Sequence, residues 1–268
     1  MYFAMDEIGF ENETKIKTID SEPDKWKFIY DIARVYGFEG IHITPSLYNK
    51  FGLDINNMPE YFQDFKLTCH LGGMWLIPKS NYEEFENKLK TVFKNAVKHK
   101  IHDISIHSPY IHGLTQSERD LSLELFNKII NKWLKILIDN GISLSLETHI
   151  AENIQFNRLN EYIEFINKYP ELGVLVDISH NYYEPQCSED EIINIFGNKN
   201  IKGFHISDSL RNVDIKMGTH LAIGEGKIDF SKILKKFNNP EIYGVLEIKA
   251  SNEGISQSLK ILKNILYE

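Results

Sequence analysis

The strongest constraint on the fold is a regular alternation of short apolar segments with longer amphipathic segments. The short segments are rich in β-branched residues and the long ones repeat apolar residues at helical spacing, which predicts alternating strands and helices. The expected strands are Tyr2–Ile8, Gly40–Thr44, Lys66–His70, Asp103–His107, Ser143–Glu147, Gly173–Asp177, Gly203–Ile206 and Gly244–Ile248. The expected helices are Asp24–Tyr36, Met58–Asp64, Tyr82–Lys98, Thr115–Asn140, Leu159–Lys168, Glu189–Phe196, Phe230–Phe237 and Ser256–Leu266.

Eight strand–helix units in 268 residues favour a closed (β/α)8 barrel, in which parallel strands form an inner ring. The rival arrangement, an open doubly wound sheet, would place a glycine-rich phosphate-binding turn after its first strand. Here Gly9-Phe10-Glu11-Asn12 follows the first expected strand, and no G-x-G-x-x-G motif opens a helix. Because no linker or low-complexity tract interrupts the chain, we expect a single domain over residues 1–268.

The composition narrows the class of protein. Hydrophobic residues make up 42% of the chain and charged residues 25%, which is enough for a substantial core and argues against wholesale disorder. Cys69 and Cys187 are too few for a disulfide framework, and no apolar run is long enough to span a membrane. Since no signal-like segment follows Met1, we expect a cytoplasmic protein. The formal net charge of −8 argues against a diffuse basic surface for nucleic acid.

Several of the expected strands end in a residue that can bind a metal, at the edge where barrel enzymes place their functional side chains. These residues are His70, His107, Glu147, Asp177, His205 and Glu247, with His180 and His220 in the following loops. A single such residue is usually a hydrogen-bonded structural group. Three carboxylates and several imidazoles at one barrel mouth are costly to bury without partners, however. Their convergence predicts a divalent cation.

The ligand types restrict the identity of that cation. Carboxylate and imidazole suit Zn²⁺, Mn²⁺, Fe²⁺ or Co²⁺, and the absence of cysteine from the set argues against a structural thiolate site. His149, two residues after Glu147, is expected to support a ligand rather than to bind the metal itself. His42 alternates with Ile41 and Ile43, which allows it to face the barrel interior near the site, although the sequence fixes no partner for it.

The order of these motifs resembles that of the xylose isomerase-like barrels, a superfamily of metal-dependent sugar isomerases and epimerases that also includes endonuclease IV. The resemblance covers nearly the whole chain. It rests on Ser105-Ile106-His107-Ser108-Pro109, Leu146-Glu147-Thr148-His149, Val176-Asp177-Ile178-Ser179-His180, Phe204-His205-Ile206-Ser207-Asp208, the segment from His220 to Phe230, and Leu246-Glu247. These segments are individually short, but their order is specific.

The resemblance implies roles for individual residues. The ketose epimerases of this superfamily hold one divalent metal with four residues, which correspond here to Glu147, Asp177, His205 and Glu247. The resemblance further implies that the two glutamates transfer the substrate proton and that His180 and Arg211 bind the substrate. The expected reaction is isomerisation or epimerisation of a sugar, sugar phosphate or polyol through an enediolate.

An alternative hypothesis is a multinuclear zinc phosphodiesterase that acts on abasic DNA. Endonuclease IV-like enzymes use the same four ligands and add others, whose roles the resemblance gives to His70, His107, His180 and His220. Their aspartate two residues before His220 is replaced by Gly218 here, which removes a charged ligand of a third metal. In the epimerase hypothesis, His70, His107 and His220 bind either a second metal or the substrate.

The remaining features favour a sugar. The segment Gly224–Phe230 is more similar to the sugar phosphate isomerase/epimerase branch, and the lysines near the mouth do not form a convincing DNA track. We therefore expect a small sugar-like substrate, with no nucleic-acid or membrane partner. The apolar face of Thr115–Asn140 is expected to pack either on its own barrel or on a second copy in a homo-oligomer. A third hypothesis for the function is a barrel that keeps the cluster but has no activity, since a fold does not determine a function.

Overall fold

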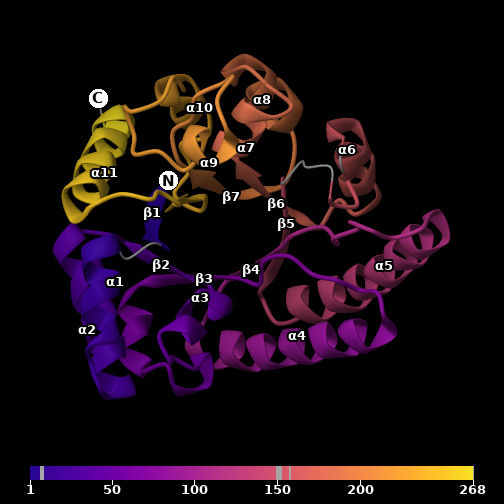
Figure 1. Ribbon diagram of the computed structural model, residues 1–268, viewed down its shortest axis with the longest axis horizontal. Helices are drawn as coiled ribbons and strands as arrows, with labels where there is room; N and C mark the ends of the chain where they lie inside the picture. Colours follow the sequence, from indigo (N-terminus) through magenta and orange to yellow (C-terminus); the bar gives the residue numbers. More distant parts are fainter. Residues whose placement is uncertain (7–8, 149–152, 157, 268) are drawn as a thin grey trace.

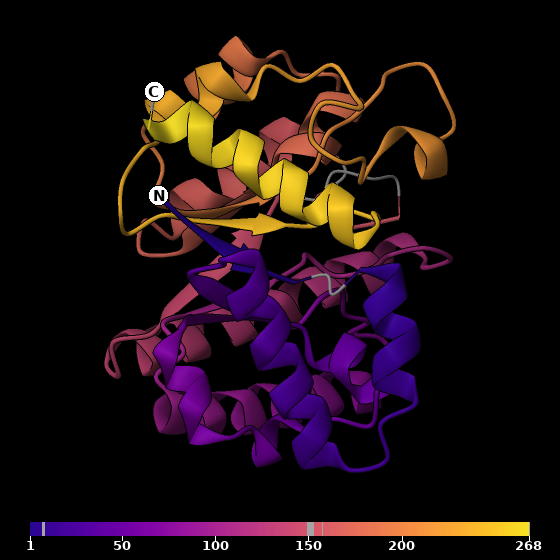
Figure 2. The same ribbon diagram turned by 90° about the vertical axis from the view of Figure 1, so that its left-hand side faces the viewer.

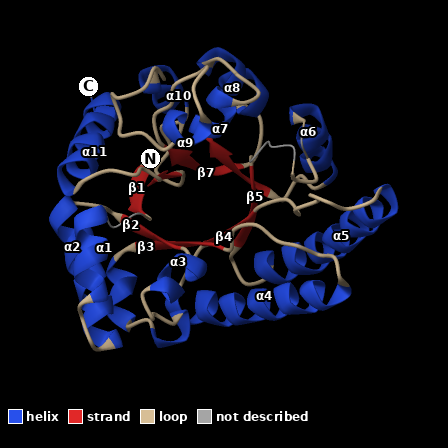
Figure 3. Ribbon diagram, viewed as in Figure 1, coloured by secondary structure: helices blue, strands red, loops and turns tan. Residues whose placement is uncertain are grey.

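The eight strands form a closed parallel barrel in sequence order, and helices surround it (Figure 1; Figure 3). The computed structural model describes residues 1–6, 9–148, 153–156 and 158–267. The strands are β1 (Tyr2–Met5), β2 (Gly40–Ile43), β3 (Lys66–His70), β4 (Asp103–Ile106), β5 (Ser143–Glu147), β6 (Gly173–Asp177), β7 (Ile201–Ile206) and β8 (Tyr243–Leu246). Because β1 pairs with β8, the ring is complete and the expected (β/α)8 barrel is confirmed.

The helices cover the outer face of the barrel, and α11 lies beside β1 where the two ends of the chain meet (Figure 2). They are α1 (Phe10–Lys17), α2 (Glu22–Tyr36), α3 (Pro45–Lys50), α4 (Lys79–His99), α5 (Gln116–Ile138), α6 (Leu159–Lys168), α7 (Ile178–Tyr183), α8 (Glu189–Phe196), α9 (Ile215–Gly218), α10 (Phe230–Lys236) and α11 (Asn252–Tyr267). Two 3₁₀ helices, η1 (Ile55–Asn57) and η2 (Glu60–Asp64), precede β3. None of the described helices is long and apolar enough to cross a membrane.

Four short helices were not expected from the sequence. Helix α1 was not predicted because its sequence shows no helical periodicity of apolar residues. Among its described side chains, Ile16 is the only buried apolar one. Helices α3, α7 and α9 have four to six residues, too few to show a period. The helix expected over Met58–Asp64 is instead the 3₁₀ helix η2.

Strand limits also differ from the expected ones, with consequences for the site. The first strand ends at Met5, and the expected extension to Ile8 includes residues 7–8, which lie outside the described part of the chain. Strands β4 and β8 end one residue before His107 and Glu247, respectively. His107 and Glu247 are therefore each the first residue after a strand.

The barrel wall separates two sets of side chains, because successive residues of a strand point to opposite faces. Outward residues such as Ile104, Leu144 and Phe204 join the large apolar core beneath the helices, which also includes Leu125 and Phe126 of α5. Among the described residues, the interior holds a small apolar cluster made of Tyr2, Ala4, Leu175, Tyr243 and Val245. The rest of the interior is largely polar, unlike the branched apolar filling that a barrel usually has.

One polar group fills the end of the barrel where the strands begin. Asp103 accepts hydrogen bonds from the hydroxyls of Tyr243 (2.6 Å) and Ser145 (2.7 Å). Burial raises the pKa of Asp103 to about 6, although both hydrogen bonds act to lower it. Gly203 makes room for the ring of Tyr243, since a Cβ at this position would lie 2.2 Å from it. These contacts seal the end of the barrel opposite the candidate site.

Candidate metal centre

The carboxylate of Glu147 lies at the centre of a cluster at the mouth of the barrel. Its Oε2 atom is 2.7 Å from Nε2 of His107 and 3.4 Å from Nε2 of His70. Its Oε1 atom is 3.2 Å from Nδ1 of His205. The four residues come from β3, β4, β5 and β7 or directly after them, because parallel strands in a barrel end at the same rim.

His205 links Glu147 to the two other carboxylates expected at the site. Its Nδ1 atom lies 3.1 Å from Oε2 of Glu247 and 3.9 Å from Oδ2 of Asp177. Glu147, Asp177 and His205 are almost completely buried, whereas 27% of the Glu247 side chain is exposed. The structure thus brings together the four residues expected as metal ligands, with Glu247 on the open side.

Asp177 is held in place by the start of the short helix α7. Its Oδ1 atom accepts a hydrogen bond from the backbone N–H of His180 at 2.7 Å. The backbone N–H of Asp177 itself donates to Oγ1 of Thr148, which also accepts from the side chain of Asn181. Oδ2 of Asp177 is buried and has no hydrogen-bond partner among the described residues. This oxygen is therefore available to a cation.

The hydrogen bonds of His70 fix which of its nitrogens carries the proton. Oγ of Ser105 donates to the carbonyl of Cys69, so it accepts from Nδ1 of His70 at 2.9 Å. Burial lowers the pKa of His70 to about 3, which makes the ring neutral. Its Nε2 lone pair therefore faces the carboxylate of Glu147 without an intervening proton, and a lone pair and a carboxylate oxygen repel unless a cation lies between them.

The charges in the cluster shift one another's pKa values strongly. Burial raises the pKa of Glu147, but the positive charges and hydrogen bonds of His107 and His205 bring it well below its usual value. Burial acts against protonation of His205, yet Glu147 and Glu247 raise its pKa well above the usual range. In the absence of a metal, protons on the histidines thus balance the carboxylate charge.

The donor set fits a divalent cation. Single ligand atoms of Glu147, Asp177 and His205 lie within 4.8 Å of one another, as do those of His70, His107 and Glu147. The first set combines carboxylate oxygens with an imidazole, the ligands expected for Zn²⁺, Mn²⁺, Fe²⁺ or Co²⁺. A cation would replace the protons that the histidines carry and would bond the unpartnered oxygen of Asp177.

The other residues expected at the site lie around the opening. The rings of His180 and His220 are 5.2 Å apart, and Nδ1 of His220 is 3.1 Å from the carbonyl oxygen of Glu247. Arg211 instead uses its guanidinium within the protein, donating to the carbonyls of Tyr182 and Cys187 and stacking on the Tyr182 ring. His149 lies outside the described residues.

Asp6 is a site residue that sequence reasoning missed. It directly follows β1, is buried, and accepts a hydrogen bond from the hydroxyl of Thr44 at 2.7 Å. Burial, followed by the negative charge of Glu247, raises the pKa of Asp6 to about 7. The expected strand continued to Ile8, which placed Asp6 inside the strand rather than at its functional end. A carboxylate next to an apolar run was the signal that could have identified it.

Asp208 organises the loop that follows β7. Its carboxylate accepts hydrogen bonds from four backbone N–H groups, those of Ser209, Gly224, Gly226 and Ile228. A Cβ at Gly226 would lie 2.2 Å from this carboxylate, so only glycine allows the close approach. The motif residues between Asp208 and Ile228 thus form a fixed wall of the mouth.

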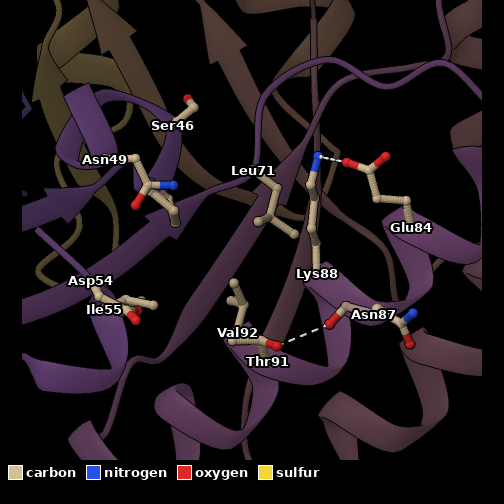
Figure 4. Close-up of a pocket in the computed structure, with 11 residues that line it drawn as sticks. Ser46, Asn49, Asp54, Ile55, Leu71, Glu84, Asn87, Lys88, Thr91 and Val92 are labelled. Atoms are coloured by element: carbon tan, nitrogen blue, oxygen red, sulfur yellow. Dashed lines mark hydrogen bonds and ion pairs between the residues drawn. The ribbon is translucent and has the colours of Figure 1, made fainter. Parts of the chain in front are cut away.

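A groove of about 400 Å³ lies outside the barrel between α3 and α4 (Figure 4). Its apolar floor includes Leu71, the residue after His70, and Pro45, the residue after Thr44. Polar side chains on its rim include Ser46, Asn49 and Asn87, and Lys88 pairs with Glu84 at 2.7 Å. Two of its lining residues thus directly follow residues at the carboxyl ends of β2 and β3 in the chain.

The fold and the cluster define a class of protein, the (β/α)8 barrels with a carboxylate–histidine centre at the carboxyl ends of their strands. The chain belongs to the xylose isomerase-like TIM barrel family, whose sequence profile matches residues 30–265. No curated protein matches the sequence significantly.

Solved structures with the same fold have several activities. A D-tagatose 3-epimerase-like protein is 18% identical, with a TM-score of 0.70 over 99% of this chain and 97% of the other. The IOLI protein, solved with a bound zinc atom, is 15% identical, with a TM-score of 0.68 over 99% and 98%. An AP endonuclease of family 2 from Brucella melitensis is 14% identical, with a TM-score of 0.73 over 97% and 99%. At these identities the similarity establishes the fold alone.

Proposed function

We propose that this protein is a divalent-metal-dependent isomerase or epimerase of a sugar, sugar phosphate or polyol. The observation that carries the proposal is the convergence of Glu147, Asp177 and Glu247 on Nδ1 of His205. A bound divalent cation would supply polarisation of the substrate carbonyl and stabilisation of the negative charge that develops on its oxygen. Glu147, Asp177, His205 and Glu247 would hold it.

The two glutamates would transfer the proton. Glu247, the more exposed carboxylate, accepts the proton from the carbon beside the carbonyl. Glu147, on the buried side, relays a proton from His107, which lies 2.7 Å away, to the opposite face. Exchange with solvent then removes the proton from Glu247 and returns one to His107. The carbon thus changes configuration without any net change in atoms.

The residues around the opening would bind the substrate. His180 and His220 present adjacent rings on the side of Glu247, where they can contact substrate hydroxyls. Arg211 would affect substrate binding indirectly, by holding the segment from Tyr182 to Cys187 in place. Its guanidinium already donates to two backbone carbonyls of that segment. The groove between α3 and α4 would receive any part of the substrate that extends beyond the reacting carbons.

The alternative is a zinc-dependent phosphodiesterase that acts on abasic DNA. The set of His70, His107 and Glu147 favours it, because a second ion at that position would help to generate and position a hydroxide nucleophile. The net charge of −8 weighs against it, since binding of DNA depends on contacts from lysine and arginine to phosphate.

Hydrogen exchange separates the two hypotheses. The protein is loaded with Mn²⁺, Co²⁺ or Zn²⁺ and incubated in D₂O with a panel of ketoses, ketose phosphates and keto-polyols. NMR then follows loss of the proton beside the carbonyl. We expect exchange with at least one compound, loss of this exchange in Glu247→Gln, and full exchange in the control Glu83→Gln, which alters an exposed residue of α4.

The opposite result is equally clear. Nicking of an abasic oligonucleotide by the metal-loaded protein, with no exchange in any member of the panel, would replace the proposal by the phosphodiesterase alternative. Exchange that persists in Glu247→Gln would remove Glu247 from the proposed role.

A further inference from the structure

Three imidazole rings meet inside the barrel, and two of them, those of His70 and His205, also contact the carboxylates. The ring of His42, from β2, lies 5.8 Å from that of His70 and 5.4 Å from that of His205. The rings of His70 and His205 are 5.4 Å apart. One nitrogen from each residue lies within 4.8 Å of the other two. On its other side, His42 approaches the Tyr243 ring, so it is deeper than any residue of the proposed catalytic cluster.

Two of these rings carry a buried nitrogen that has no hydrogen-bond partner in the described part of the chain. Nδ1 of His42 is 2.6 Å from the hydroxyl oxygen of Thr68, which leaves Nε2 as the other nitrogen of that ring. Nδ1 of His205 faces the carboxylates, which leaves its Nε2. Both Nε2 atoms are buried without a hydrogen bond to the described residues, in rings that are 1% and 3% exposed. Buried polar atoms normally have a partner, because leaving one unsatisfied is destabilising.

His70 completes the set with a nitrogen whose lone pair is already exposed to the cluster. Its Nδ1 proton is directed to Ser105, so Nε2 is the available atom. His107, the other histidine near His70, is different, because its Nε2 lies 2.7 Å from Glu147 and is satisfied by that ion pair. Nε2 of His42, Nε2 of His205 and Nε2 of His70 therefore remain as candidate ligand atoms.

We propose that His42, His70 and His205 form a second metal site that binds a transition-metal ion such as Zn²⁺, Co²⁺ or Ni²⁺. Neutral imidazoles suit these ions, and three of them leave one position of a tetrahedral ion for water. Thr68 orients His42, as the partner of the second nitrogen does for most metal-binding histidines. With ions in both sites, the ring of His205 binds through both nitrogens and releases its remaining proton to solvent.

Zinc stoichiometry tests the site without any assay of turnover. Metal-free protein is equilibrated with Zn²⁺ at fixed free concentrations, and the zinc bound per chain is measured by mass spectrometry of the elements. We expect two ions in the wild type, one in His42→Phe, and two in the matched control His107→Phe. The variant His42→Gln, which keeps a polar side chain at this position, should also bind one ion.

A change beside the site tests the role of Thr68. Thr68→Val keeps the shape of the residue but removes the hydroxyl that orients His42, and we expect about a 10–100-fold loss of affinity for the second ion alone. This variant also decides the matter if neither His42 variant folds. Two ions in His42→Phe, unchanged affinity in Thr68→Val, or a single ion in the wild type would each overturn the proposal. None of these results bears on hydrogen exchange by Glu247, so the two proposals fail independently.

Discussion

Nε2 of His107 lies 2.7 Å from Oε2 of Glu147, and the register of two strands accounts for this contact. Ser105 and Ser145 are partners across β4 and β5, as are Ile106 and Leu146. The next residue along the two segments is His107, directly after β4, and Glu147, the last residue of β5, and both point into the barrel because side chains alternate along an extended segment. The alternation of inward and outward side chains in two segments far apart in the sequence thus creates a buried ion pair at the mouth.

Replacing Glu147 by glutamine should abolish the proposed activity. The amide cannot deliver a proton to the substrate or carry the negative charge that His107, His205 and a cation share. We expect proton exchange from a substrate to fall by at least about 100-fold, the usual scale for loss of an acid–base group. NMR of the substrate in D₂O provides the measurement.

The control for this change is Glu86→Gln. Glu86 is also a buried carboxylate, but it contacts Lys132 and Trp133 on the outer helices. Its loss should reduce stability and leave exchange per folded molecule intact. Retention of full exchange in Glu147→Gln would contradict the assigned role.

Addition of metal should stabilise the protein, and more at pH 8 than at pH 6. His205 has a raised pKa in the metal-free protein, so protons compete with a cation for this ligand and the competition weakens as the pH rises. At 100 times its Kd, a bound ion contributes about 2.7 kcal/mol, which is roughly 5–10 °C in Tm for a chain of this size. Thermal denaturation with Mn²⁺ or with a chelator at both pH values measures the difference.

The comparison requires a variant that lacks the ligands. In Asp177→Asn the shift on addition of Mn²⁺ should become much smaller at both pH values, because the free carboxylate oxygen is lost. A shift that is equal at pH 6 and pH 8 in the wild type would show that the histidines do not compete with the ion.

The barrel was predictable from the sequence because its evidence repeats eight times, in short apolar runs such as Val174–Val176. The residues that gather at the mouth were identified for the same reason. Asp6 was missed because the end of a four-residue strand is not marked by any change of period. The contacts of Arg211 were also out of reach, since they depend on the path of two loops rather than on any local pattern.

Asp103 should make the protein less stable as the pH rises from 4 to 7. Its pKa is raised from the ordinary value near 3.8 to about 6, because burial disfavours the charged form. Its contribution to stability is therefore complete below the ordinary value and is lost as the pH passes through 6. The shift corresponds to a loss on the order of 3 kcal/mol.

Denaturant unfolding of metal-free wild type and Asp103→Asn at several pH values isolates this effect. The variant lacks the titrating group, so the free energy of unfolding of the wild type relative to the variant should decrease between pH 4 and pH 7. A difference that stays constant over this range would mean that Asp103 titrates normally. Asp103 makes its hydrogen bonds to Tyr243 and Ser145, so the variant removes none of the proposed metal ligands.

Replacing Arg211 by alanine should destabilise the loops around the mouth before it affects the chemistry. The guanidinium donates to the carbonyls of Tyr182 and Cys187, at 3.0 Å and 2.8 Å, and its planar group stacks on the ring of Tyr182. Hydrogen bonds from a charged group contribute about 1.5–3 kcal/mol, so we expect Tm to fall by roughly 3–10 °C. Hydrogen exchange of the backbone amides of residues 182–187 should accelerate, while Arg34→Ala, at an exposed site on α2, should change neither quantity.

Because lysine cannot reproduce the planar fork, Arg211→Lys should restore little of the lost stability. If Arg211 instead reaches the substrate directly, Arg211→Ala will raise KM with no change in Tm or in amide exchange.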